Sequence, residues 1–137
     1  MSATIRIYNP EAIWQPRGAY SHVADVRGAT RTVYFAGIVA ANPEGETVGE
    51  NDFAAQADQV FANLGECLRS TGLEWTNIVQ FTTYLCRPED VPVFAQWRRD
   101  RFPRLFGSRA FPPNTLLIVS RLADPKVLLQ VQSIAAE

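Results

Sequence analysis

NDFAAQADQVFANLGECLRSTG, residues 51 to 72, is the stretch on which the fold depends. Its apolar residues recur at intervals of three and four, which predicts an amphipathic helix. Asn51 or Asp52 can cap its first turn, and Gly72 suits the left-handed conformation that ends a helix. Such a helix needs a sheet or a second helix to cover its apolar face. The residues on that face are Phe53, Ala57, Val60, Leu64 and Leu68.

Strand-like segments flank this helix on both sides. TVYFAGIVA (32–40) is apolar on both faces, so we expect a central strand. Gly37 within it indicates a bulge, or a close approach by a ligand or another chain. NIVQFTTYL (77–85) alternates and is rich in β-branched residues, which predicts a second strand.

A second helix and two strands complete the predicted order. RPEDVPVFAQWRRDRF (87–102) has Asp90 as its expected cap and Pro103 as its expected end. TLLIVSRL (115–122) and VLLQVQSIAA (127–136) are predicted strands. The order β-α-β-α-β-β, after short strands near the N-terminus, predicts an α+β fold with both helices on one face of a sheet. The length of 137 residues fits a single domain, 1–137.

The last strand also predicts an oligomer. In VLLQVQSIA, Leu129 and Val131 share one face, whereas Gln130, Gln132 and Ile134 share the other. Helices on a single side leave this second face to be covered, and other copies of the chain are the simplest cover.

Composition excludes several classes of function. A net charge of −1 argues against a broad nucleic-acid or membrane surface. No apolar run approaches the length of a membrane span, and MSATIRIYNP lacks the apolar core of a signal peptide. Cys67 and Cys86 have no CxxC spacing, so we expect reduced thiols in a cytoplasmic protein.

No catalytic or metal-binding motif is evident. His22 is the only histidine, and its neighbour Ser21 would point to the opposite face of a strand, so a Ser-His-Asp arrangement with Asp25 is disfavoured. One histidine and two scattered cysteines make a metal site improbable. Nucleotide-binding glycine motifs are missing, so no cofactor is expected.

One basic cluster stands out beside Trp97. It could hold phosphates, but the solvated face of the second helix is the favoured interpretation. The cluster comprises Arg98, Arg99, Arg101 and Arg104.

Six further segments belong together: GAYSHVA (18–24), VYFAGIV (33–39), DFAAQADQVFANLGECLRSTGL (52–73), IVQFTTYL (78–85), FPPNTLLIVSRL (111–122) and LLQVQSIA (128–135). In this order they resemble the RidA/YjgF (Rid) family over nearly the whole chain. The resemblance implies a chorismate-mutase-like mixed sheet with two helices on one face, and a homotrimer with pockets at its subunit interfaces. It also implies hydrolytic deamination of enamine and imine intermediates such as 2-aminoacrylate, without a cofactor.

The family's site residues can be carried over by position. Tyr20 matches the tyrosine of a G-x-Y motif, and Gly37 matches the glycine of a strand motif in which Ala36 replaces serine. The resemblance implies that Tyr20 is catalytic and that Ala36 and Gly37 contact the substrate.

The last two motifs depart from the family pattern. Asn114 occupies the position of the arginine that pairs with the substrate carboxylate, followed by Thr115 and by Leu116 at a small polar position. Gln130 replaces the glutamate that holds the attacking water, and Gln132 replaces a second glutamate.

These departures imply a neutral pocket. An amide replacing a guanidinium loses a charge-assisted pair that is typically worth about 2–5 kcal/mol. A glutamine keeps the shape of a glutamate but accepts no proton. Acidic imines are therefore poor substrate candidates, unless Arg17, Arg109 or Glu89 returns a charge to the pocket, with Glu89 as the replacement acid.

Three functions remain open. The first is a hydrolase or deaminase-like enzyme for a small metabolite other than 2-aminoacrylate. The second is a non-catalytic trimer that binds a small ligand or a partner. The third and least favoured is a ribonuclease, supported only by the arginine cluster.

Overall fold

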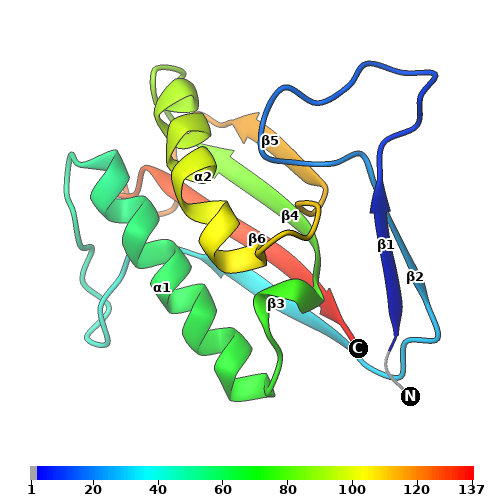
Figure 1. Cartoon of the computed structure of the whole chain (residues 1–137). Coiled ribbons are helices and arrows are strands. Elements are labelled where there is room, and N and C mark those ends of the chain that lie inside the picture. The colour runs from blue at the N-terminus through cyan, green and yellow to red at the C-terminus, as the bar shows by residue number, and fades with distance from the viewer. Residues whose placement is uncertain (1–2) are drawn as a thin grey trace.

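Two helices cover one face of a four-stranded sheet in the computed structural model, which describes residues 3–137 (Figure 1). A two-stranded hairpin lies beside this sheet. The predicted α+β class with a mixed sheet is confirmed. The elements are β1 (Thr4–Tyr8), β2 (Val23–Arg27), β3 (Thr32–Ile38), α1 (Phe53–Thr71), a 3₁₀ turn (Trp75–Asn77), β4 (Ile78–Leu85), α2 (Asp90–Phe106), β5 (Asn114–Ile118) and β6 (Leu129–Ala136).

The larger sheet has the order β3-β6-β4-β5. β6 is antiparallel to β3 and β4, whereas β5 runs parallel to β4. The expected succession β-α-β-α-β-β is therefore confirmed. The expectation that β3 is central is wrong, because it forms one edge of the sheet and its Tyr34 is 75% exposed.

The helix ends follow local chemistry. Asp52 caps α1 by accepting a hydrogen bond from the Ala55 amide, and Gly72 ends it at a φ of 75°. Pro103 does not end the second helix as predicted, because α2 continues through it to Phe106. A proline removes only one helical hydrogen bond, and Gly107 donates its amide to the Pro103 carbonyl to close the last turn. The cap position is Glu89, and the predicted cap Asp90 instead pairs with Arg87 at 2.7 Å.

An aromatic cluster joins the helices to the sheet. Phe61 of α1 contacts Phe81 of β4 and Phe102 of α2, with ring centroids 6.0 and 5.7 Å apart. Gln56 is fully buried beside this core and is satisfied by three backbone groups, the carbonyls of Gly49 and Lys126 and the amide of Leu128. This packing fixes α1, α2 and β4 relative to one another.

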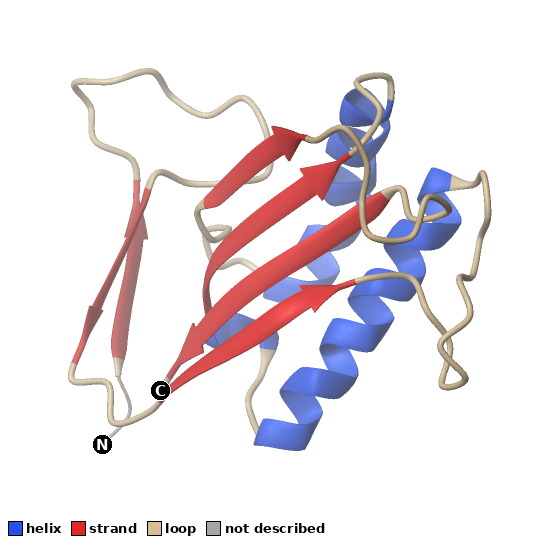
Figure 2. Cartoon of the chain, turned by 180° about the vertical axis from the view of Figure 1, so that it is seen from behind, coloured by secondary structure: helices blue, strands red, loops and turns tan. Residues whose placement is uncertain are grey.

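The opposite face of the sheet carries no helix (Figure 2). Leu129 and Val131 point to the helices and are fully buried, whereas Gln130 and Gln132 lie on the bare face, as the alternation of β6 predicts. Tyr34 and Leu117 leave 75% and 40% of their surface exposed. No helix in the described part of the chain is both long and apolar enough to cross a bilayer.

Candidate functional site

Asn114 is the first residue of β5 and lies on the helix side of the sheet. In the parallel register it is opposite Phe81, whose ring packs under α2. The Thr83 hydroxyl donates a 2.8 Å hydrogen bond to the Asn114 side-chain oxygen. Leu116, two residues on, shares this side and packs against the core, whereas Thr115 between them lies on the bare face and is exposed.

Tyr20 lies next to the start of β5. Ser21 forms a bridge with Pro113 and donates its amide to the Pro112 carbonyl, which brings the segment after β1 alongside β5. The indole of Trp14 donates to the Tyr20 hydroxyl at 3.3 Å. The structure thus gathers Tyr20, Thr83, Asn114 and Leu116 at the edge of the sheet, and we call them the edge cluster.

Arg17 and Tyr20 belong to one surface depression. Arg17 is exposed and, with Trp14 and Tyr20, lines a depression of about 710 Å³. Two other candidates lie apart from Tyr20. Arg109 donates to the Ile78 carbonyl at 2.9 Å, and Glu89 lies beyond the ends of β4 and β5, at the opposite end of β5 from Asn114.

Gln130 and Gly37 form a second group on the bare face. The register places Gln130 opposite Tyr84, and β3 is irregular between Phe35 and Ile38. A Cβ atom at Gly37 would lie 2.7 Å from Cδ of Gln130, which is closer than real Cβ contacts. A side chain at position 37 would therefore require the Gln130 side chain to move. We call Ala36, Gly37 and Gln130 the face cluster.

The two clusters lie on opposite faces within one protomer. Residues paired across neighbouring strands share a face, so Asn114 lies on the side of Phe81 and Gln130 lies on the side of Tyr84. Phe81 and Tyr84 are three residues apart in β4 and point in opposite directions. Asn114 and Gln130 of the same chain therefore cannot line one pocket.

Sequence reasoning missed the residue with the most unusual environment, Arg98. The basic cluster was expected on a solvated face, but Arg98 is only 7% exposed, and its Nε and Nη1 atoms are buried without a hydrogen-bond partner. Its guanidinium carbon lies 4.6 Å from the centroid of the Phe94 ring. Helical spacing was the available signal, because position 98 is four residues from both Phe94 and Phe102 on the apolar face of α2.

Burial lowers the pKa of Arg98 to about 10, and the nearby charge of Arg99 acts in the same direction. Tyr20 is a smaller influence and acts in the opposite direction on this pKa. Arg98 remains a cation at neutral pH.

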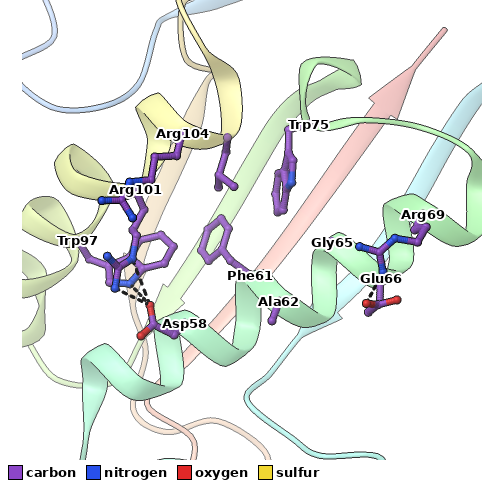
Figure 3. Close-up of a pocket in the computed structure, with 11 residues that line it drawn as sticks. Asp58, Phe61, Ala62, Gly65, Glu66, Arg69, Trp75, Trp97, Arg101 and Arg104 are labelled. Carbon is purple, nitrogen blue, oxygen red and sulfur yellow. Dashed lines mark hydrogen bonds and ion pairs between the residues drawn. The ribbon is translucent and has the colours of Figure 1, made fainter.

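A further groove separates α1 from α2 (Figure 3). It has a volume of about 430 Å³, with Phe61 and Trp75 among its walls. Its charged groups largely pair with each other, since Arg101 binds Asp58 at 3.2 Å and Arg69 binds Glu66. None of the residues predicted for the pocket lies in this groove.

His22 and the cysteines form no catalytic arrangement in the described residues. The His22 ring packs against Trp14 at 4.8 Å, and both of its ring nitrogens are buried without a partner. Cys67 and Cys86 are free thiols. Residues 3–137 contain no group of three or more histidine, cysteine, aspartate or glutamate side chains suited to a metal.

The chain is thus a small α+β protein with candidate site residues at one edge of its sheet and on the bare face of that sheet. Residues 10–137 match the family described as endoribonuclease L-PSP. The chain belongs to this family, the RidA/YjgF or Rid family, as the six segments indicated.

Individual relatives agree with this assignment. Human 2-iminobutanoate/2-iminopropanoate deaminase is 29% identical over 90 residues, which cover 63% of this chain and 64% of the relative. The crystal structure of the Rid-family protein YyfB from Yersinia pestis, of unknown function, covers 100% of both chains with 29% identity and a TM-score of 0.84. RidA from Psychrobacter sp. PAMC 21119 shares the fold at 24% identity, covering 90% of this chain and 92% of its own, with a TM-score of 0.67.

The contact between Gly37 and Gln130 gives a stability prediction. Gly37→Ala should destabilise the protein by about 1–3 kcal/mol, because the new methyl group displaces the Gln130 side chain. Adding Gln130→Ala should recover part of that loss. Denaturant unfolding of the single and double variants, at one protein concentration, measures this coupling.

Gly65→Ala is the matched control. Its Cβ would meet Trp75 at 3.5 Å, an ordinary contact, so this change within α1 should stabilise by about 0.5–1 kcal/mol. Strictly additive effects of the Gly37 and Gln130 changes would contradict the proposed contact.

Proposed function

We propose that this chain forms a homotrimer with small-molecule pockets between its subunits, and that it is a hydrolase or deaminase-like enzyme for a small metabolite other than 2-aminoacrylate. The observation that carries the proposal is the placement of the two clusters on opposite faces of one sheet. Each cluster holds only part of the residues that the family resemblance assigns to one pocket. Joining the edge cluster of one protomer to the face cluster of the next completes the set.

The bare face supports the same assembly. Tyr34 and Leu117 expose apolar surface there on the edge strands β3 and β5, and the polar groups of Gln130 and Gln132 lie on β6 between these edges. Burial of this surface by neighbouring copies would stabilise the sheet and bring each face cluster against another chain. Cys67 and Cys86 are free thiols, in keeping with a cytoplasmic location as part of the proposal.

The chemistry of the pocket favours a changed substrate. Several relatives are named as 2-iminobutanoate/2-iminopropanoate deaminases, which makes imine hydrolysis the starting hypothesis. Asn114 already accepts a hydrogen bond from Thr83 and offers no charge to a carboxylate. Gln130 offers an amide where hydrolysis of an imine needs a group that accepts a proton from water. Tyr20 is the remaining hydroxyl of the edge cluster, and Glu89 would have to reach the pocket from another chain.

A non-catalytic trimer that binds a small ligand is the second candidate. The observation that favours it is Gln130 itself, because its amide is held over Gly37 in a position where it can bind a ligand but cannot act as a base. RNA cleavage has less support. Arg98 is buried, Arg101 is engaged by Asp58, and the net charge is −1.

The first prediction concerns assembly. Size-exclusion chromatography with light scattering at micromolar concentration should give a molar mass of about three times that of one chain. The reason is that the proposed pocket combines the edge cluster of one protomer with the face cluster of another. Tyr34→Glu should weaken this assembly by placing a charge on the bare face, whereas Glu66→Gln on the outer side of α1 should not. A monomeric wild type would remove the basis of the interface pocket.

The second prediction concerns activity. We expect little or no hydrolysis of 2-aminoacrylate, because the carboxylate clamp and the water-holding acid are both replaced. A coupled assay that generates the imine in place, with an arginine-containing relative as positive control, measures this. Turnover equal to that of the control would refute the proposed change of substrate.

The third prediction tests whether the clusters meet across a subunit boundary. Asn114→Arg or Gln130→Glu alone should lower the melting temperature or trimer content, because each adds an uncompensated charge. The double variant should recover part of the loss, with a coupling of about 0.5–3 kcal/mol, and should bind pyruvate better than either single variant.

The geometry makes that coupling dependent on assembly. Since the two positions lie on opposite faces of one protomer, their coupling should disappear when the trimer is diluted to monomers. Additive melting shifts with no effect of pyruvate would show that Asn114 and Gln130 do not share a pocket.

A further inference from the structure

Arg98 is a buried cation without a matching anion. Its exposed fraction is 7%, and its Nε and Nη1 groups have no acceptor within residues 3–137. A buried polar group without a partner loses its hydration and gains nothing in return, and a charged group loses more. The contact with Phe94 offsets part of this cost but supplies no hydrogen-bond acceptor.

The face of α2 that carries Arg98 packs on the start of β5. Phe102 lies one turn further along the same face, and its ring contacts Phe81 at 5.9 Å and Phe111 at 5.5 Å. Phe81 is opposite Asn114 in the sheet register, and Phe111 precedes Asn114 by three residues. Arg98 lies between Phe94 and Phe102 on this face of α2, so it faces the part of the sheet that carries Asn114 and Thr83.

We propose that Arg98 is the carboxylate receptor of this pocket, so that the positive charge missing at position 114 is supplied from α2 instead of β5. The inference rests on the proposed pocket and names its ligand class as small monocarboxylates. A guanidinium with free N–H groups binds the planar oxygens of a carboxylate through charge-assisted hydrogen bonds.

The burial of Arg98 favours a singly charged ligand. A phosphate dianion is usually held by several cations or by a series of backbone amides, and the neighbour Arg99 is exposed on the outside of α2. One buried guanidinium neutralises one negative charge. In the family pattern the positive charge comes from β5, whereas here it would come from α2. A carboxylate held from α2 would place the rest of the ligand differently, which would account for a different substrate.

Ligand binding by the intact protein tests the proposal. Calorimetric titration would use pyruvate, 2-oxobutanoate and benzoate as carboxylate probes, acetone as the uncharged analogue of pyruvate, and inorganic phosphate as the alternative anion. Wild type should bind at least one carboxylate and should bind acetone much more weakly. Arg98→Met should weaken carboxylate binding by roughly 30-fold or more, because the pair with the charged partner is lost.

The unliganded stability separates a binding role from a structural one. Arg98→Met replaces an unpaired buried cation by an apolar side chain, so its melting temperature without ligand should equal or exceed that of wild type. Arg98→Lys retains the charge but not the planar fork, and should bind carboxylates with intermediate affinity. This second variant keeps the test decisive if the methionine variant fails to fold. Arg99→Met, at the exposed neighbour, is the control that should leave binding unchanged.

Several results would overturn the proposal. These are equal carboxylate affinity in wild type and the Arg98 variants, no binding of any carboxylate probe, a preference for phosphate, or a large loss of melting temperature in Arg98→Met without any effect of carboxylates. Light scattering of the same samples separates this inference from the proposed assembly. If the protein is a trimer and the Arg98 variants bind ligand as wild type does, only the proposed role of Arg98 is contradicted. If a monomer binds carboxylates and the Arg98 variants do not, only the proposed interface pocket is contradicted.

Discussion

The contact among the rings of Phe61, Phe81 and Phe102 determines how the two helices lie on the sheet. These rings join α1, β4 and α2, so the face of α2 that carries Phe102 must lie on the sheet. Arg98 shares that face and is buried as a consequence. Phe81 is also the register partner of Asn114, which makes one aromatic cluster responsible for the core and for the position of the edge cluster.

The guanidinium of Arg98 beside these rings is buried at a cost in free energy. Removing an ion from water costs several kcal/mol even after the protein relaxes, and neither acidic nor carbonyl oxygens meet the Nε and Nη1 atoms of Arg98 in the described chain. Arg87 shows the contrast, since it is partly exposed and forms a bidentate pair with the buried Asp90, at 2.7 and 2.8 Å. A ligand that supplies the missing acceptor would convert a destabilising group into a binding one.

The sequence predicted the elements better than the environments of individual residues. Hydrophobic periodicity located both helices and the alternation of β6, because an element with one buried face repeats its apolar residues at its own period. It misjudged the end of α2, since a proline near the last turn costs one hydrogen bond and the aromatic packing of Phe102 and Phe106 outweighs it. It also assigned Arg98 to solvent by residue type, although its spacing from Phe94 and Phe102 places it on the apolar face.

The arrangement of the two clusters could not be deduced from motifs alone. Asn114 and Gln130 belong to different strands, and only the pairing of both strands with β4 shows that they face opposite sides. Two substitutions that look like the loss of one charged pair thus affect separate surfaces of the protomer. In the proposed trimer these surfaces would meet across a subunit boundary, and the charge of the proposed pocket would come from groups that each protomer already holds in place. On the edge side that group is Arg98, and on the bare face it is the amide of Gln130 held over Gly37. The first is a cation and the second a neutral dipole, so in the proposed pocket a carboxylate would be held by Arg98, and activation of water in a hydrolase would require a group other than Gln130.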